Sequence, residues 1–269
     1  MRDRDLTLIR SRDNPRFKSL RELASSTRER RKAGLALLDG AHLIAAYRAS
    51  GGVPEQLILS ESAASNPEAA QLAAGTSGLG LLVLADALFN DVAQVATPTG
   101  IIALIRTPRP GPLPARFDHC VMLENIQDAG NLGSILRSTA AAGIGTVLLS
   151  QGCAFAWSSK VLRAGMGAHF SLDIFDNVDL AAAVPRLSGR LICTTGRARK
   201  SLYQADLRGP LAWVFGNEGA GVSAPLSALA AEEVRIPMPG KTESLNVAAA
   251  AAICLFEQVR QTMQGPPAR

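Results

Sequence analysis

Short apolar runs alternate with amphipathic segments along most of the chain, and this alternation predicts an α/β protein. In the first half, strands are expected over residues 35–38, 56–60, 81–84 and 100–105. Helices there are expected to open at Asn14-Pro15 and to cover residues 41–49, 61–80 and 87–96. In the second half, strands are expected over residues 119–123, 146–150, 191–195 and 212–215, with helices over residues 131–142, 158–165 and 245–262.

A proline-rich segment separates the two halves. Residues 106–117 contain four prolines and a glycine, which oppose both helix and sheet. We therefore expect an N-terminal domain over residues 1–106, a linker over residues 107–117 and a C-terminal domain over residues 118–269. The strands of the C-terminal domain are uninterrupted apolar runs, which favours a parallel sheet covered on both faces.

Positive charge is concentrated at the N-terminus. The 269-residue chain has a net charge of +5, and residues 1–32 alone hold eleven Lys or Arg against five Asp or Glu. Such a segment suits the phosphate backbone of a nucleic acid, and the alternative is a solvated helix surface rich in arginine. Hydrophobic residues make up 47% of the chain, which excludes a disordered protein.

The four cysteines are far apart in the sequence and show no metal-ligand spacing, so no metal site is expected. Three of them lie in apolar runs, as buried free thiols do, which indicates a reducing compartment. The N-terminal residues lack an apolar signal sequence, and the longest apolar run, residues 247–256, is too short to cross a bilayer. A cytoplasmic protein without membrane contact is expected.

The first polar motif follows the expected strand 119–123 and runs to Arg137. A strand that ends in a polar, glycine-containing loop before a helix is where open α/β sheets bind ligands. Asn131 lies near the start of the expected helix, and Arg137 lies more than one turn inside it among small and apolar residues. A buried or half-buried arginine there needs an anionic partner, either a ligand or an acid such as Glu218.

Two further motifs follow later strands. Residues 215–221 form a glycine-rich segment that admits a close ligand or is merely a tight turn. Its spacing is not GxGxxG, which occurs nowhere in the chain, so a nicotinamide-dependent oxidoreductase is disfavoured. Residues 236–248 contain Gly-Lys-Thr, but Arg235 stands where a phosphate-binding P-loop needs glycine. Ser244 or Asn246 can cap the helix that follows.

Together and in this order, the three motifs resemble the signatures of the SpoU (TrmH) family of RNA 2'-O-ribose methyltransferases, in the SPOUT superfamily. They are Asn131-x-Gly133-x-Ile135-x-Arg137, then Phe215-Gly216-Asn217-Glu218-Gly219-x-Gly221, then Ile236-Pro237-Met238 with Ser244-Leu245-Asn246-Val247-Ala248. The similarity covers about residues 118–262. Residues 11–105 resemble the small, ribosomal-protein-like RNA-binding domain that precedes the catalytic domain in many members, with Asp39 where Glu is common.

The resemblance implies a reaction, a cofactor and an assembly. A methyl group of S-adenosyl-L-methionine would pass to the 2'-hydroxyl of a ribose in structured RNA. The C-terminal domain would contain a deep trefoil knot, and homodimers would form through it. The cofactor pocket would be lined by Thr195, Gly196, Gly216, Ile236, Met238, Ser244, Leu245 and Asn246.

The resemblance also implies four catalytic residues, namely Arg137, Asn131, Glu218 and Asn246. Because a guanidinium is hard to deprotonate, we expect Arg137 to stabilise the reacting oxygen and to anchor the adjacent phosphate rather than to act as a base. Asn131 would orient the ribose or the arginine, and Glu218 would hold Arg137 in place.

Two basic groups are expected to contact RNA phosphates, with an affinity that falls steeply with salt. They are Arg12, Arg16, Lys18, Arg30, Arg31 and Lys32 near the N-terminus, and Arg197, Arg199 and Lys200 after the Thr195-Gly196 loop. By family habit, ribosomal RNA is favoured over transfer RNA. Two alternatives stay open: a non-catalytic RNA-binding or ribosome assembly protein on the same fold, and a knotted methyltransferase that acts on a base.

Overall fold

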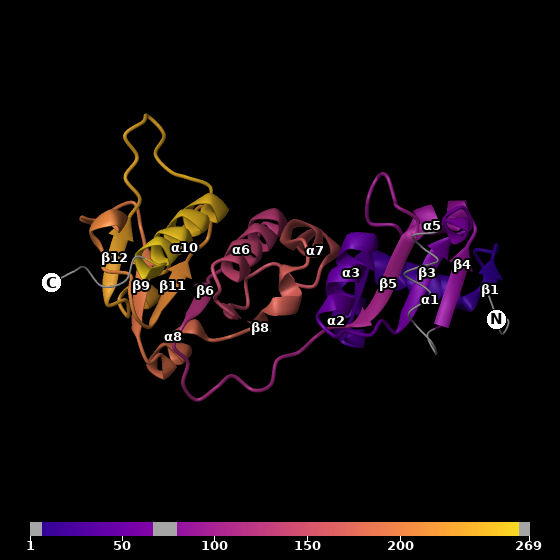
Figure 1. Ribbon diagram of the computed structural model, residues 1–269, viewed down its shortest axis with the longest axis horizontal. Coiled ribbons are helices and arrows are strands. Elements are labelled where there is room, and N and C mark those ends of the chain that lie inside the picture. The colour runs from indigo at the N-terminus through magenta and orange to yellow at the C-terminus, as the bar shows by residue number, and fades with distance from the viewer. Residues whose placement is uncertain (1–6, 67–79, 264–269) are drawn as a thin grey trace. The chain divides into compact units, whose positions relative to one another are not determined.

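The fold is given by a computed structural model that describes residues 7–66 and 80–263 (Figure 1). The chain forms two compact units. The first unit joins Met1–Pro108 with Trp157–Phe170, and the second joins Arg109–Ala156 with Ser171–Arg269. The chain passes from the first unit to the second within the proline-rich segment, and Trp157–Phe170 returns to the first unit from the middle of the second.

The first unit contains a five-stranded mixed sheet. In sheet order its strands are β1 (Thr7–Ile9), β4 (Gly80–Leu84), β3 (Gln56–Ser60), β5 (Ile101–Arg106) and β2 (Leu35–Asp39). The first three run parallel to one another, whereas β5 is antiparallel to both β3 and β2. The core of this unit includes the fully buried side chains of Phe17, Leu37, Ile58, Leu84 and Phe89.

The helices of the first unit begin and end at capping residues. Ser26 ends α1 (Pro15–Ser25) and caps α2 (Thr27–Ala33), so residues 15–33 form two separate helices. Gly34 has a φ of 65° and ends α2 in the left-handed conformation that glycine adopts at little cost. The other helical segments are α3 (Ala41–Ala49), η1 (Ala63–Ser65), α5 (Asp86–Val92), α7 (Ser159–Gly165) and η2 (Ala168–Ser171).

The returning segment Trp157–Phe170 is held in the first unit by polar and aromatic contacts. The Arg163 guanidinium donates to the Gln94 carbonyl oxygen at 2.5 Å, and the centroids of the Tyr47 and Phe170 rings are 5.1 Å apart. The Asp39 carboxylate accepts the Gln94 N–H at 2.8 Å. Burial raises the pKa of Asp39, and the Gln94 N–H and the positive charge of Arg163 oppose this only in part.

The second unit contains a seven-stranded sheet in which every pair of neighbouring strands is parallel. In sheet order its strands are β10 (Lys200–Ser201), β12 (Glu232–Arg235), β9 (Arg190–Thr194), β11 (Leu211–Phe215), β6 (Cys120–Leu123), β7 (Thr146–Leu149) and β8 (Asp173–Phe175). Because all strands run the same way, their carboxyl ends form one edge and their amino ends form the other.

Helices pack against this parallel sheet. They are α6 (Ala129–Ala141), α8 (Leu180–Ala183), η3 (Val184–Arg186), η4 (Leu202–Gln204), α9 (Ala224–Ser227) and α10 (Val247–Met263). The long helices α6 and α10 lie against each other (Figure 1). The fully buried Trp213 of β11 donates its indole N–H to Gln258 of α10 at 2.8 Å, so this helix is fixed to the centre of the sheet.

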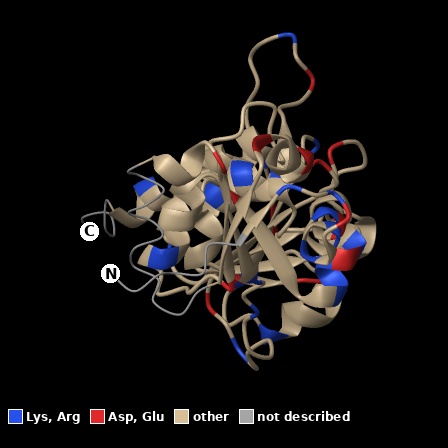
Figure 2. Cartoon of the chain, turned by 90° about the vertical axis from the view of Figure 1, so that its right-hand side faces the viewer, with Lys and Arg blue, Asp and Glu red and all other residues tan. Residues whose placement is uncertain are grey.

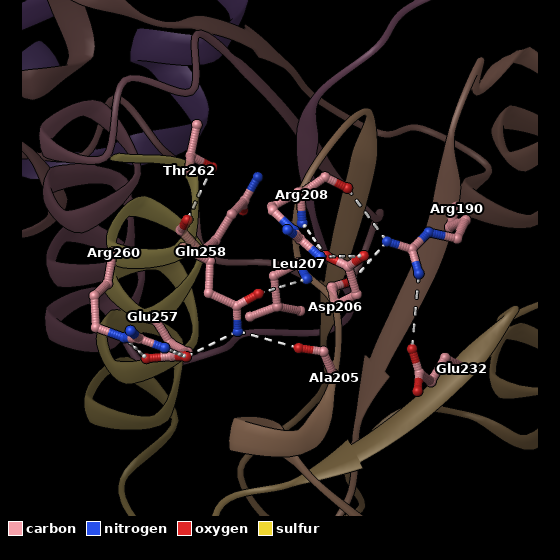
Figure 3. Close-up of polar contacts among 11 residues, drawn as sticks. Arg190, Ala205, Asp206, Leu207, Arg208, Glu232, Glu257, Gln258, Arg260 and Thr262 are labelled. Atoms are coloured by element: carbon pink, nitrogen blue, oxygen red, sulfur yellow. Dashed lines mark hydrogen bonds and ion pairs between the residues drawn. The ribbon is translucent and has the colours of Figure 1, made fainter. Parts of the chain in front are cut away.

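A polar network closes the amino edge of the parallel sheet, and we refer to Arg190, residues 205–208, Glu232, Glu257, Arg260 and Gln261 as the amino-edge network (Figure 3). The Arg190 guanidinium at the start of β9 donates to the Asp206 carbonyl at 2.6 Å and lies 3.9 Å from the Glu232 carboxylate. Gln261 accepts the Leu207 N–H at 2.9 Å and donates to the buried Glu257 at 2.8 Å. The network therefore fastens loop 205–208 to both the sheet and α10.

Most of the predicted elements are present, and the differences have local causes. The predicted helix 87–96 ends at Val92, because the Asp39 carboxylate binds the Gln94 N–H in an extended segment. The predicted helix 245–262 begins at Val247, because the Asn246 side chain caps it. Part of the predicted helix 61–80 lies outside the described residues. Strands β1, β8, β10 and β12 were not predicted. No described helix is long and apolar enough to span a membrane.

Candidate functional site

The three sequence motifs meet at the carboxyl edge of the parallel sheet. The first occupies the loop after β6 and the start of α6, the second follows β11, and the third joins β12 to α10. The β12–α10 loop extends well beyond the sheet in Figure 1, and residues 239–246 within it are exposed. The parallel sheet thus brings Asn131 next to residues that are 87 and 115 positions away in the sequence.

Asn131, Glu218 and Asn246 form one hydrogen-bonded cluster, with one residue from each motif. The Asn131 side-chain amide donates to the Glu218 carboxylate at 2.9 Å. The Asn246 side-chain amide donates to the Asn131 carbonyl oxygen at 2.8 Å. The Asn131 carboxamide is therefore used in both directions, and it fixes the positions of the other two side chains.

Capping interactions hold two of these residues, Asn131 and Asn246, in place. Asp128 accepts the Asn131 N–H at 2.7 Å and starts α6 two residues earlier than predicted. Asn246 accepts the Ala248 N–H at 2.9 Å and starts α10. Each residue of the cluster that belongs to a helix therefore lies in its first turn or at its cap, where side chains reach beyond the helix end.

The turn that presents Glu218 depends on Asn217 and Gly216. The Asn217 side-chain oxygen accepts the Gly219 N–H at 2.9 Å, and the Asn217 side-chain amide donates to the Asn125 backbone oxygen at 3.0 Å. A Cβ atom at Gly216 would come within 2.2 Å of the Gly221 backbone. Glycine is therefore required at this position by the turn itself.

A pocket of about 150 Å³ lies between the ends of β9 and β12 and the start of α10. Among the predicted cofactor-binding residues, its walls include Thr195, Gly196, Ile236, Met238, Ser244 and Leu245. The walls do not include Gly216 or Asn246, which lie in the turn and the cluster described above. The pocket is also lined by Thr194, Val234, Glu243 and Ala250, which the motifs did not identify. Thr194 and Glu243 are each next to a predicted residue, and Val234 lies two positions from one.

Arg137 differs from its expected setting. The sequence suggested a buried or half-buried side chain whose anionic partner is either a ligand or an acid such as Glu218. The residue is exposed and makes no ion pair with any described residue. Glu218 is bonded to Asn131 instead. Positions six apart on a helix are separated by about 240° around its axis, so Asn131 and Arg137 lie on different faces of α6. Within one chain, Arg137 is therefore free to bind an anion.

The basic residues fall into different structural classes, and one prediction is wrong. Arg30 was expected to bind RNA, but it is 4% exposed, and its guanidinium donates to the Leu23, Ala24 and Thr27 oxygens at 2.5 to 3.0 Å. It joins α1 to α2 and cannot reach a phosphate. Arg16, Lys32, Arg197 and Arg199 are exposed.

Three of the other predicted RNA-binding cations are exposed and have acidic partners. Arg12 lies 3.0 Å from Asp91, Lys18 lies 2.9 Å from Asp13, and Lys200 pairs with Glu232. Arg31 is exposed as well. Basic and acidic segments are interspersed in Figure 2 rather than separated. Surface pairs of this kind are weak and exchange readily for a phosphate partner.

The four cysteines are free and buried. Burial raises the pKa of Cys120 and of Cys254 to about 12, which keeps both thiols protonated near neutral pH. The described residues contain no group of His, Cys, Asp and Glu side chains able to hold a metal ion. The polar chemistry of this unit therefore resides in amides, carboxylates and arginine.

Comparison with known proteins agrees with this geometry. Residues 118–256 match the family described as SpoU rRNA Methylase, and residues 14–103 match the MRM3-like substrate binding domain. The chain is 34% identical to a tRNA/rRNA methyltransferase of Synechocystis, over 96% of this chain and 95% of the relative. It is 29% identical to the 23S rRNA (guanosine(2553)-2'-O)-methyltransferase RlmP of Bacillus subtilis, over 92% of this chain and 97% of the relative.

A solved structure shows the same similarity in three dimensions. The SpoU methyltransferase AviRb of Streptomyces viridochromogenes, in complex with AdoMet, superposes with a TM-score of 0.83 at 27% identity, over 94% of this chain and 100% of that chain. The family, α/β fold class, reaction class and cofactor that the sequence motifs predicted are confirmed, and the chain belongs to the SpoU rRNA methylase family.

Proposed function

We propose that this protein methylates ribosomal RNA, at the 2'-hydroxyl of a ribose that is placed at the carboxyl edge of the parallel sheet. The observation that supports this placement is the cluster of Asn131, Glu218 and Asn246, which joins the three motifs through hydrogen bonds of 2.8 and 2.9 Å. The cluster lies at the end of α10 that also helps to form the 150 Å³ pocket.

The residues of this pocket suit S-adenosylmethionine. Val234, Ile236, Met238 and Leu245 offer apolar contact to an adenine ring, and the Thr195, Ser244 and Glu243 side chains offer polar groups to the ribose and amino acid. At Gly196 a backbone without a side chain permits close approach of a ligand. The bound cofactor supplies an activated methyl group. We propose that Gly216 and Asn246 act beside this pocket, through the turn and the cluster.

Arg137 is the residue we assign to the reacting oxygen and the adjacent phosphate. Its exposed guanidinium makes no ion pair with the described residues, so its charge is available to an RNA phosphate. A fixed cation beside the 2'-oxygen stabilises the negative charge that develops as the hydroxyl proton leaves. Asn131 orients the ribose, and Glu218 positions Asn131 rather than Arg137.

The substrate is assigned to ribosomal RNA on two grounds. Residues 14–103 match a substrate-binding domain, and the relative from Bacillus subtilis is named for a guanosine of 23S rRNA. In the first unit the exposed Arg12, Arg16, Lys18, Arg31 and Lys32 would contact RNA phosphates. In the second unit Arg197, Arg199 and Lys200 follow the pocket residues Thr195 and Gly196, and would guide RNA to the site.

We also propose a homodimer, formed through the second unit with its expected trefoil knot. The exposed α10 side chains Phe256 and Met263 are 48% and 82% exposed, and positions seven apart lie on the same face of a helix. A second copy would cover this apolar face and would bring an exposed Arg137 to a neighbouring site. With its free thiols the protein suits the reducing cytoplasm.

The test is methyl transfer from labelled S-adenosylmethionine to total RNA from a strain that lacks the protein, followed by nucleoside analysis. We expect a 2'-O-methylated nucleoside in ribosomal RNA. Arg137→Ala should reduce this product at least about 100-fold while cofactor affinity stays unchanged, as for other losses of a charge-stabilising group. Near-normal turnover by Arg137→Lys would contradict the role of Arg137.

Two other outcomes would support different functions. Cofactor binding without transfer to any RNA would favour a non-catalytic assembly protein, and methylation of a base would favour a base-directed enzyme. Label found only in transfer RNA would overturn the assignment to ribosomal RNA.

A further inference from the structure

A second pocket lies at the carboxyl edge of the parallel sheet, and its volume is about 610 Å³. It is formed by the loops after β6 and β7, the segment that leads into α8, and the start of α9, all within the second unit. Its volume falls within the range of roughly 300–1,000 Å³ that is usual for small-molecule sites. None of its residues lines the 150 Å³ pocket, so the two pockets are distinct.

The second pocket is joined to the Asn131 cluster by its own wall residues. The Asn125 backbone oxygen accepts the Asn217 amide at 3.0 Å, and Asn217 directly precedes Glu218. The Glu124 carboxylate accepts the Ser223 N–H and hydroxyl, each at 2.7 Å. The loops that hold the catalytic side chains therefore also form a wall of this pocket. Asn125 has a φ of 55°, a backbone conformation that is uncommon outside glycine and is often found at functional sites.

The residues that line the second pocket indicate which ligands it can bind. The apolar lining includes Leu180 and Leu226, which are almost completely buried beneath the pocket. The polar lining includes the Asp179 carboxylate and the Gln151 carboxamide, and the lining residues include no Lys, Arg or His. Such a pocket repels a phosphate and suits a flat ring that is rich in N–H donors.

Guanine is the nucleobase that fits this description best. Its Watson–Crick edge presents the N1–H and N2–H₂ donors side by side, as a carboxylate requires for two parallel hydrogen bonds. Adenine and cytosine each present a donor next to a ring nitrogen acceptor, which a carboxylate would repel. RNA-binding proteins commonly receive a splayed-out base between apolar side chains and read this edge.

We propose that the second pocket binds the guanine base of the target nucleotide, with Asp179 as the residue that selects guanine. The inference rests on the proposed function, because the base must be attached to the ribose that is methylated. One Asp179 oxygen caps α8 by accepting the Ala182 N–H at 3.1 Å, and the other oxygen has no hydrogen-bond partner among the described residues. Gln151 is exposed and also lines this pocket.

Binding of guanosine 5'-monophosphate and adenosine 5'-monophosphate, measured by ligand-observed NMR with S-adenosylhomocysteine present, tests this site without catalysis. We expect the guanine nucleotide to bind at least about 10-fold more tightly, and Asp179→Asn to abolish the preference. Asparagine caps helices as well as aspartate, so the fold is retained. Asp173→Asn, at an exposed carboxylate outside the pocket, is the matched control and should keep the preference. Gln151→Ala is a second variant that removes no side-chain hydrogen bond found among the described residues.

Equal binding of the two nucleotides, or a preference that survives Asp179→Asn, would overturn the inference. The methyl transfer assay separates this failure from failure of the proposed function. If the wild-type product is 2'-O-methylguanosine and Asp179→Asn lowers its rate about 10-fold with unchanged cofactor affinity, the inference is supported. A different methylated nucleoside would overturn the inference and leave the methyltransferase assignment intact. No methyl transfer, with the guanine preference retained, would overturn the proposed function alone.

Discussion

The two edges of the same parallel sheet hold their loops in different ways. At the amino edge, charged groups face each other: Arg260 lies 2.6 Å from Glu257, and Arg208 lies 2.7 Å from Asp206 (Figure 3). At the carboxyl edge, amides make the connections, as in the hydrogen bonds of Asn131 to Glu218 and of Asn246 to Asn131. One edge pairs its charges with each other, and the other joins its loops through the neutral side-chain amides of Asn131 and Asn246.

This difference assigns stability mainly to the amino edge and catalysis mainly to the carboxyl edge. A guanidinium held by two hydrogen bonds to a buried carboxylate, as Arg260 is by Glu257, is less available to a phosphate or a developing oxyanion than an unpaired one. Amides can fix three loops in space and leave nearby charge available, because they are neutral and can donate and accept at the same time. Changes at the carboxyl edge should therefore reduce turnover more than stability, and changes at the amino edge should do the reverse.

Among the residues that hold the loops of the two edges, the largest effect is expected at Asn131. Asn131→Ala removes both hydrogen bonds of the cluster and frees Glu218 and Asn246. We expect a loss of kcat/KM of about 10- to 100-fold, because the ribose and the three loops lose their alignment. The measurement is steady-state methyl transfer at a temperature well below the melting temperature.

Ser134→Ala is the control for this variant, since Ser134 is an exposed α6 residue one turn from Asn131. It should retain full activity. An Asn131→Ala protein with normal activity would contradict the proposal that the carboxyl edge serves turnover and the amino edge serves stability. A loss of activity that follows loss of folding would contradict it as well.

An intermediate effect is expected at Glu257, which is 8% exposed and accepts from Arg260 and Gln261. We expect Glu257→Gln to lower the free energy of unfolding by about 1 to 2 kcal/mol at neutral pH, through weaker hydrogen bonds, and to leave kcat unchanged. Urea unfolding at pH 7 measures this, with Glu22→Gln, at an exposed carboxylate of α1, as the matched control.

The same variant has a predicted pH dependence. Hydrogen bonding to Arg260 is the main cause that lowers the pKa of Glu257 below its ordinary value of 4.5. A lowered folded-state pKa means that the stabilisation is complete above about 4.5 and is lost as the pH falls below it. Wild-type stability should therefore fall between pH 5 and more acidic values by more than that of Glu257→Gln, and parallel curves would contradict the assignment.

The smallest effect is expected at Asp206, where both members of the pair with Arg208 are more than a third exposed. Hydrogen bonding to Arg208 lowers the pKa of Asp206 from 3.8 to about 2. Its contribution is present above pH 3.8 and is lost toward pH 2, and solvent screening keeps it small. Asp206→Asn should shift the urea midpoint at pH 7 by less than Glu257→Gln does. A larger shift would show that exposed pairs also hold this edge.

The central strands could be predicted from the sequence because burial on both faces requires continuous apolar runs. Strands β6, β7, β9 and β11 illustrate this, since nearly all of their residues are buried. The strand β12 (Glu232–Arg235) was missed because its charged residues pair with neighbours near the sheet margin, as Glu232 does with Arg190 and Lys200. Such pairing depends on segments that are distant in the sequence and leaves no periodic pattern.

The site was predicted in part for a similar reason. The motifs identified Asn131, Glu218 and Asn246, but no spacing could show that Glu218 bonds to Asn131 instead of Arg137. The burial of Arg30 was also hidden, because a charged segment of sequence gives no sign that one guanidinium donates to helix carbonyls. The second pocket was missed altogether, because its walls come from four short segments with no common motif.

The return of Trp157–Phe170 to the first unit has a consequence for how the chain is made. A ribosome releases residues in order, so β6, α6 and β7 emerge before the first unit has its last segment. Domains generally fold as they leave the ribosome, N-terminal part first. Until residues 157–170 have emerged, the Gln94 carbonyl lacks its hydrogen-bond donor Arg163, and the Tyr47 ring lacks its neighbour Phe170. A nascent chain halted shortly before residue 157 would consequently expose Tyr47 to solvent and to chaperones. Because each unit is built from two stretches of the chain, truncating the gene at one point would not yield either unit complete.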